Sequence, residues 1–249
     1  MLSSPMPYSS IVVTAPHLPP DLPGVKRVAS FLELVSTPFA DGVNALCWAR
    51  PLEGDFAEVV ACLGHHETEM DALDETRLLA LPVGPAGRIA VERLVADLRL
   101  LREHGLEPVL DLIHAYPRDE SPGPVATDVY SFHADSAPIE ADTWLCTYHG
   151  PASEGVPNSD VRRRVDDPAT RAALLALHDG PDDAAFEEFL RDNCYDLHYA
   201  AAPDARVFSF GLGALWRIAV AHPAARVPPC IHRAPAQPLG LPPRLLLIS

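Results

Sequence analysis

The sequence has few cysteines, a shortage of positive charge and no long apolar run. Its five cysteines are odd in number, widely spaced and without a Cys-x-x-Cys motif, which argues against a disulfide scaffold or a zinc finger. Lys and Arg number 19 against 34 Asp and Glu, for a formal charge of −15 at pH 7. A chain this acidic is poorly suited to nucleic-acid phosphates or to anionic membranes, so neither is expected among its partners.

The sequence also lacks signals of export and of membrane insertion. Residues 1–10 have neither a basic start nor an apolar centre, so they do not resemble a signal peptide. No run of eighteen or more apolar residues occurs, and we therefore expect no membrane-spanning helix. Both observations predict a cytoplasmic protein.

What the sequence does contain is the composition of a folded globular domain. Its 249 residues are 48 % hydrophobic and its mean hydropathy is close to zero, which is enough to bury a sizeable core. Because all-β sandwiches and barrels of this length are often single domains, we expect one domain over residues 1–249. Twenty-seven prolines indicate many rigid loops.

The order of predicted elements favours an α+β fold. Residues 1–26 are rich in Pro and Ser and are expected to form an irregular arm. Residues 27–107 are predicted to be mainly helical, and the longest helix, about 88–104, carries an apolar stripe. Residues 108–249 show the pattern of short strands, interrupted at about 166–193 by a helical insertion. The expected architecture is a β core with flanking helices.

Three polar residues in this strand-rich part are candidate metal ligands. If residues 130–135 form a strand or strand end, His133 and Asp135 point to the same side, because side chains alternate along a strand. A second imidazole from a distant strand, that of His232, completes a set that binds Fe(II) and leaves positions open for a co-substrate and oxygen. The alternative is that both histidines are satisfied at a sheet edge and that Asp135 caps a turn. That alternative must explain polar groups within apolar strand patterns, since burying them unpaired costs free energy.

Arg244 is a second, independent element of the pattern. A turn rich in Pro and Gly follows His232, and an apolar run occupies residues 245–248, so the segment is predicted to form strand, turn and strand. An Arg at the start of the returning strand can lie beside the metal ligands. Its planar guanidinium is suited to binding a carboxylate through two hydrogen bonds.

His133-x-Asp135, His232 and Arg244 together resemble the signature of the Fe(II)/2-oxoglutarate-dependent oxygenases. The longer segments are also similar to an uncharacterised bacterial family with the same pattern; they are Phe132-His-Ala-Asp, Leu145-Cys-Thr-Tyr-His-Gly-Pro and His232-Arg-Ala-Pro. The resemblance covers about residues 125–249. It implies a double-stranded β-helix core (jelly-roll or cupin-like), iron bound by the two His and the Asp, and Arg244 binding the far carboxylate of 2-oxoglutarate.

The activity that this resemblance implies is oxidation of a substrate by O2, with 2-oxoglutarate as co-substrate; the modest length of the chain and its Arg-rich loop favour a small polar metabolite as that substrate. Hydroxylation, desaturation and cyclisation are all compatible outcomes, and an amino acid is one candidate substrate. Two other classes stay open: a cupin-like metal enzyme that does not use 2-oxoglutarate, and a non-catalytic jelly-roll binding protein. In the first, Arg244 binds substrate or is structural; the second predicts that the protein retains no iron. The oligomeric state is not predicted.

Residues of the neighbouring strand and loop are candidates for binding the co-substrate and the substrate. On a strand over residues 142–149, Tyr148 and Thr147 lie on opposite faces, and the resemblance favours one of them as a hydrogen-bond donor to the co-substrate. The following segment, to about residue 164, looks like an active-site loop, with Asn158, Arg162 and Arg164 as candidates for substrate contacts. The alternative for the arginines is a surface salt-bridge cluster with the nearby aspartates.

Other histidines compete for these roles. His198 and His222 are rivals for the distal ligand, but neither is followed by an Arg at a comparable distance on a new strand. His232 is therefore preferred. The cluster at residues 65–67, His-His-Glu, is interpreted as a polar loop after a helix rather than as a metal site.

Overall fold

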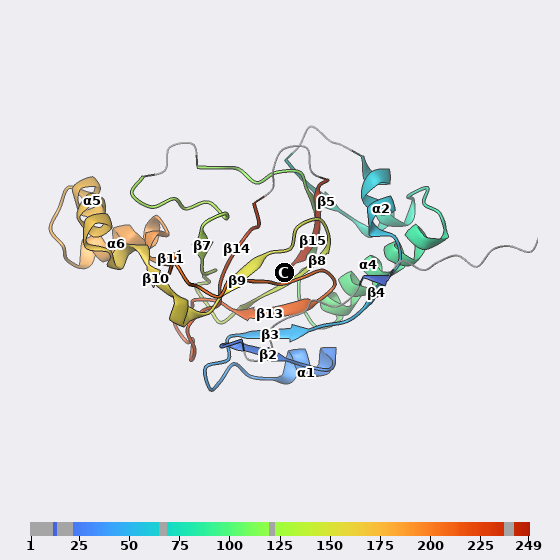
Figure 1. Ribbon diagram of the computed structural model, residues 1–249, viewed down its shortest axis with the longest axis horizontal. Helices are drawn as coiled ribbons and strands as arrows, with labels where there is room; N and C mark the ends of the chain where they lie inside the picture. Colours follow the sequence, from blue (N-terminus) through green and yellow to red (C-terminus); the bar gives the residue numbers. More distant parts are fainter. Residues whose placement is uncertain (1–11, 14–21, 65–68, 120–122, 237–241) are drawn as a thin grey trace, which may run out of the picture.

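The computed structural model describes residues 12–13, 22–64, 69–119, 123–236 and 242–249, and two β-sheets form its centre (Figure 1). The larger sheet has the strand order β2 (Val25–Arg27), β3 (Ala45–Trp48), β13 (Leu215–Ala219), β8 (Asp142–His149), β15 (Arg244–Ile248), β6 (Val109–Ile113) and β5 (Met70–Leu73). The smaller sheet has the order β10 (Val161–Arg163), β11 (His198–Ala201), β7 (Phe132–His133), β14 (Ile231–Arg233), β9 (Glu154–Val156) and β12 (Phe208–Ser209). Within both sheets the strands pair antiparallel, apart from β2 with β3.

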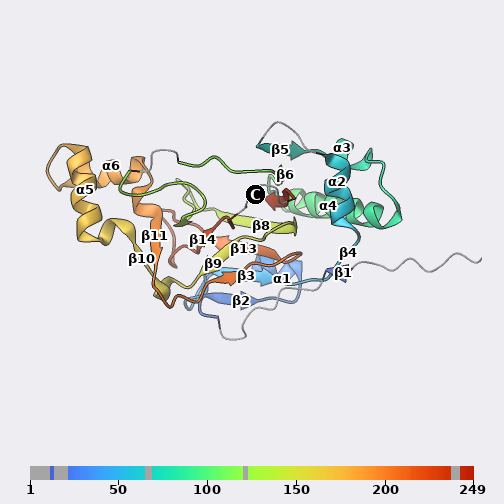
Figure 2. The same cartoon turned by 45° about the horizontal axis from the view of Figure 1, so that its top comes forward.

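Most helices form two groups at opposite ends of the molecule, while one short helix, α1 (Phe31–Ser36), lies beside β3 (Figure 2). Those that pack on the larger sheet are α1 (Phe31–Ser36), α2 (Phe56–Leu63), α3 (Glu75–Leu79) and α4 (Pro85–Glu103), with the short pair β1 (Val12–Val13) and β4 (Leu52–Glu53) nearby. The others, α5 (Pro168–His178) and α6 (Ala184–Asp192), lie between β10 and β11 with the short 3-10 turns η2 (Arg164–Asp166) and η3 (Tyr195–Leu197). They have a small core of their own, around Leu174 and Phe186.

Strand β8 separates two hydrophobic clusters, because alternate side chains enter opposite ones. Trp144, Cys146 and Tyr148 join the core that contains the helices. Leu145 joins the second cluster, which lies between the two sheets and includes Trp216 of β13 and side chains from the smaller sheet. Only one face of β8, the face that carries Leu145, therefore borders the space between the two sheets.

The observed architecture confirms a mixed fold with a largely antiparallel β core and flanking helices. The finer assignment to a double-stranded β-helix stays a prediction. Residues 27–107 contain the four helices α1 to α4, but they also supply β3 and β5 to the larger sheet, so this part is not a separate helical layer. In the described parts of the chain, no helix is both long enough and apolar enough to cross a membrane.

A buried polar network ties the longest helix to β8. The guanidinium of Arg50 donates to both carboxylate oxygens of Asp97 on α4, at 2.6 and 2.5 Å. The hydroxyl of Tyr148 donates to Asp97 Oδ2 at 2.7 Å. All three side chains are buried, so the charge of Arg50 is compensated away from solvent. Tyr148 consequently faces the helices, and this position does not support its predicted role as a donor to a co-substrate.

Replacing Tyr148 by Phe is expected to lower stability without affecting ligand binding. The variant loses one hydrogen bond to a buried carboxylate, which contributes about 2 kcal/mol to the free energy of unfolding. Denaturant unfolding measures that loss. Metal titration of the same variant is expected to match that of the wild type, and a weakened metal affinity would contradict the orientation described here.

Candidate metal centre

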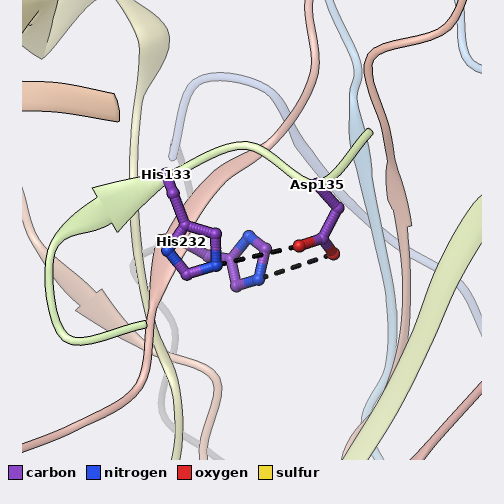
Figure 3. A group of neighbouring side chains, drawn as sticks. All are labelled: His133, Asp135 and His232. Carbon is purple, nitrogen blue, oxygen red and sulfur yellow. Dashed lines mark ion pairs between the residues drawn. The ribbon is translucent and has the colours of Figure 1, made fainter. Parts of the chain in front are cut away.

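His133, Asp135 and His232 converge on one point between the sheets (Figure 3). His133 ends β7 and lies directly opposite His232 of β14 in an antiparallel pair. Asp135 follows two residues later, beyond the end of the strand, so a loop rather than strand alternation carries its carboxylate to the site. The Nε2 atoms of His133 and His232 each lie 3.7 Å from one oxygen of that carboxylate. One ligand atom from each residue can be chosen so that all lie within 4.8 Å of one another.

The backbone determines which nitrogen of each imidazole faces the carboxylate. His133 Nδ1 lies 2.8 Å from the carbonyl oxygen of Ser131, and His232 Nδ1 lies 3.4 Å from that of Cys230. A carbonyl can only accept, so these contacts require the proton on Nδ1 and leave the Nε2 lone pair toward Asp135. Burial also lowers the pKa of His232, which favours the neutral ring that binds metals.

A third histidine flanks the pair without joining it. His198 of β11 is the cross-strand neighbour of His133 on the side opposite His232, so three imidazoles form a row across the smaller sheet. His198 Nδ1 is 2.6 Å from Ser131 Oγ. Burial, followed by the electrostatic effect of the neighbouring His133 and Arg164 side chains, lowers the pKa of His198 to about 4. Among the described residues no group of three metal-binding side chains includes His198 or the other rival, His222.

Gly155 continues the same row beyond His232. It pairs with His232 on one side and with Phe208 of β12 on the other. A Cβ at this position would lie 2.4 Å from Phe208 Cζ and 2.6 Å from Phe210 Cε1. Glycine therefore lets the aromatic rings pack beside the distal histidine.

Replacing Gly155 by Ala is expected to destabilise the fold by about 1–3 kcal/mol, because the added methyl group overpacks a filled site. Thermal or denaturant unfolding provides the measurement. A second change, Phe208→Leu, makes room for the methyl group, so the double variant should recover part of the loss. Additive effects of the two substitutions would show that the predicted contact is not the cause.

Arg244 is a buried cation with no acidic partner among the described residues. Its side chain is 0 % exposed, and burial lowers its pKa. Its guanidinium donates to the hydroxyls of Tyr116 at 3.0 Å and of Ser153 at 3.1 Å, and Nε has no partner within the described parts of the chain. Arg50, by contrast, is buried against a carboxylate. An uncompensated buried charge is costly, so this arrangement favours an anionic ligand.

One cavity of about 140 Å³ is lined both by the His-Asp-His cluster and by Arg244. Its walls are formed by the three candidate ligands, Arg244 and side chains of β8, β15 and nearby loops, namely Tyr116, Val129, Thr143, Leu145, Ser153, Ala234, Leu246 and Ile248. A larger surface hollow of about 360 Å³ lies elsewhere, around Arg217 and His222. Among the described residues, the smaller cavity brings a group of three metal-binding side chains together with a cation that has no acidic partner.

The remaining predicted contact residues lie outside this cavity. Thr147 does not line it, and its backbone carbonyl accepts from Gly213. Asn158 accepts a hydrogen bond from the side chain of Asn44, so it fastens a loop rather than facing the cavity. Arg162 forms an exposed ion pair with Asp167 at 2.9 Å. These contacts do not support the predicted substrate contacts of Asn158 and Arg162, which stay predictions, and the ion pair of Arg162 agrees with the salt-bridge alternative.

Arg164 also lies away from the cavity, beside His198, and its predicted contact with substrate is not supported. The His-His-Glu cluster at residues 65–67 lies outside the described residues. Three polar residues of the cavity wall were not predicted as contact residues from the sequence: Tyr116, Ser153 and Thr143. For Thr143 a signal existed, since it shares a strand face with Leu145.

No protein-family model matches the sequence, and comparison with curated proteins and with solved structures finds no similar chain. The functional assignment rests on the geometry of the cavity.

Proposed function

We propose that the protein is a non-haem Fe(II)- and 2-oxoglutarate-dependent oxygenase that acts on a small metabolite. The observation that carries this proposal is the pairing of two features in one cavity. A His-Asp-His cluster lies on its wall. The same cavity contains Arg244, a buried guanidinium that pairs with no described acidic residue.

The donor set fits Fe(II). Two imidazole nitrogens and one carboxylate oxygen suit this ion and leave coordination positions for other ligands. No thiolate is required, and burial raises the pKa of the neighbouring Cys230 thiol to about 12, so it stays protonated. When bound, Fe(II) supplies the redox chemistry that couples decarboxylation of 2-oxoglutarate to oxidation of a substrate by O2.

The residues around the metal ligands are proposed to bind and orient the co-substrate and to exclude water from the cavity. We propose that Arg244 binds the far carboxylate of 2-oxoglutarate, since among the described residues its Nε has no partner and its other donors contact only neutral hydroxyls. Leu145 and Leu246 give the cavity apolar walls. Such walls strengthen electrostatic contacts inside the cavity by keeping water out.

The finer parts of the proposal concern topology and substrate. Two facing, largely antiparallel sheets are compatible with a double-stranded β-helix. The cavity volume of about 140 Å³ favours a small molecule. Hydroxylation, desaturation and cyclisation differ only in the fate of the oxidised substrate, and the cavity favours none of them.

The test is an anaerobic titration of metal-free protein with Fe(II) and then with 2-oxoglutarate. The proposal predicts a weak visible charge-transfer band that appears only when both are present. Fe(II) binding without the band would favour a metal enzyme that does not use 2-oxoglutarate. Absence of Fe(II) binding would overturn the proposal and favour a binding protein.

A further inference from the structure

We propose that Thr143 is a positioning residue that fixes the metal-binding orientation of Asp135. This inference rests on the proposed function, because it concerns how the same site holds its metal. Thr143 lies on β8, in the larger sheet, whereas both histidines belong to the smaller one. Its side chain lines the cavity beside the candidate ligands.

The contact is short and selects one oxygen of the carboxylate. Thr143 Oγ1 donates to Asp135 Oδ2 at 2.6 Å. Each oxygen lies 3.7 Å from one imidazole, Oδ1 from His133 Nε2 and Oδ2 from His232 Nε2, but Oδ1 accepts no hydrogen bond from a described side chain. A hydrogen bond to Oδ2 engages one of its lone pairs and leaves Oδ1 as the more available metal ligand.

Asp135 needs such a restraint more than the histidines do. It lies beyond the end of β7, and its side chain is 30 % exposed, against 15 % and 10 % for His133 and His232. The backbone carbonyl of Asp135 accepts a hydrogen bond from the N–H of Ala221 at 2.8 Å. That bond holds the backbone but does not fix the orientation of the carboxylate. Thr143 is the only described side chain that donates to the Asp135 carboxylate.

With Thr143 included, each candidate ligand has one outer partner. The carbonyls of Ser131 and Cys230 orient the two imidazoles, and the Thr143 hydroxyl orients the carboxylate. Outer partners of this kind fix ligand orientation and are commonly worth 10- to 100-fold in metal affinity. A carboxylate held through one oxygen also keeps a coordination position free for the co-substrate.

The experiment measures Mn(II) affinity of the metal-free protein by calorimetry, since Mn(II) binds the same donor types without turnover. Thr143→Val keeps the shape of the side chain and removes the hydroxyl, so we expect Mn(II) binding to weaken about 10-fold. Thr143→Ser keeps the hydroxyl and should stay within about threefold of the wild type. Thr143→Ala, a second variant without the hydroxyl, should weaken binding as Val does. Thermal unfolding of each metal-free variant confirms that it is folded.

Two results would overturn the role of Thr143 while leaving the proposed function intact. The first is wild-type affinity in folded Thr143→Val. The second is an equal loss in Thr143→Val and Thr143→Ser, because the cause is then packing rather than the hydroxyl. Failure of the wild type to bind Mn(II) or Fe(II) is a different outcome, since it removes the metal site and the proposed function together.

Discussion

Replacing His133 by Ala is expected to weaken Fe(II) binding more than about 100-fold, because even outer partners of metal ligands are worth 10- to 100-fold. The substitution removes one of three donors whose atoms lie within 4.8 Å of one another. The charge-transfer band with 2-oxoglutarate should disappear with the metal. Anaerobic titration followed by absorbance and by calorimetry measures both effects.

His222→Ala is the matched control. His222 is also a histidine of the strand-rich part of the chain, but it lines the larger surface hollow and does not belong to the His-Asp-His cluster. The control should bind Fe(II) as the wild type does. If His222→Ala lost the metal and His133→Ala kept it, the cluster described here would not be the binding site.

Replacing Arg244 by Met is expected to weaken 2-oxoglutarate binding about 100-fold, since lost charge-assisted hydrogen bonds amount to about 3 kcal/mol. Fe(II) affinity should change little, because Arg244 is not one of the clustered ligands. The free energy of unfolding should not fall. The guanidinium is buried without a described carboxylate, and replacing such a charge by an apolar chain of similar length is often neutral or stabilising.

Two further variants separate shape from charge. Arg244→Lys keeps a cation but loses the planar pair of donors, so 2-oxoglutarate affinity should lie between that of the wild type and that of Arg244→Met. Arg233→Met removes a charge next to His232, but that charge is paired with Glu154 at 2.7 Å. It should leave 2-oxoglutarate binding unchanged. An equal loss in both Met variants would show that net charge, not the anchoring contact, controls binding.

The sequence predicted the candidate ligands better than their surroundings, for a physical reason. Two residues apart, His133 and Asp135 can reach one point whether a strand or a short loop joins them, and the structure uses a loop. The choice of His232 over His198 depended on the Arg that follows, but both histidines flank His133. Strand order decides which neighbours a ligand has, and periodicity along one strand does not encode that order.

The sequence also did not reveal toward which part of the fold each face of a strand points. Alternation on β8 separated Tyr148 from Thr147 correctly, yet it did not indicate which face meets the helices. That choice depended on Asp97, a single acid on the apolar side of α4, which accepts from Tyr148. The partners of Arg162 and Asn158 were likewise set by neighbours that the loop sequence does not identify.

If the proposed site binds a metal, the short strands of the smaller sheet would give that ion a mechanical role as well as a chemical one. β7 has two residues and β14 has three, and a single residue pair, His133 with His232, joins them. A bound ion would cross-link two segments about a hundred residues apart and Asp135, much as a disulfide closes a long loop. Metal loading would then slow local opening of β7 and β14, while the larger sheet is held by its own apolar core.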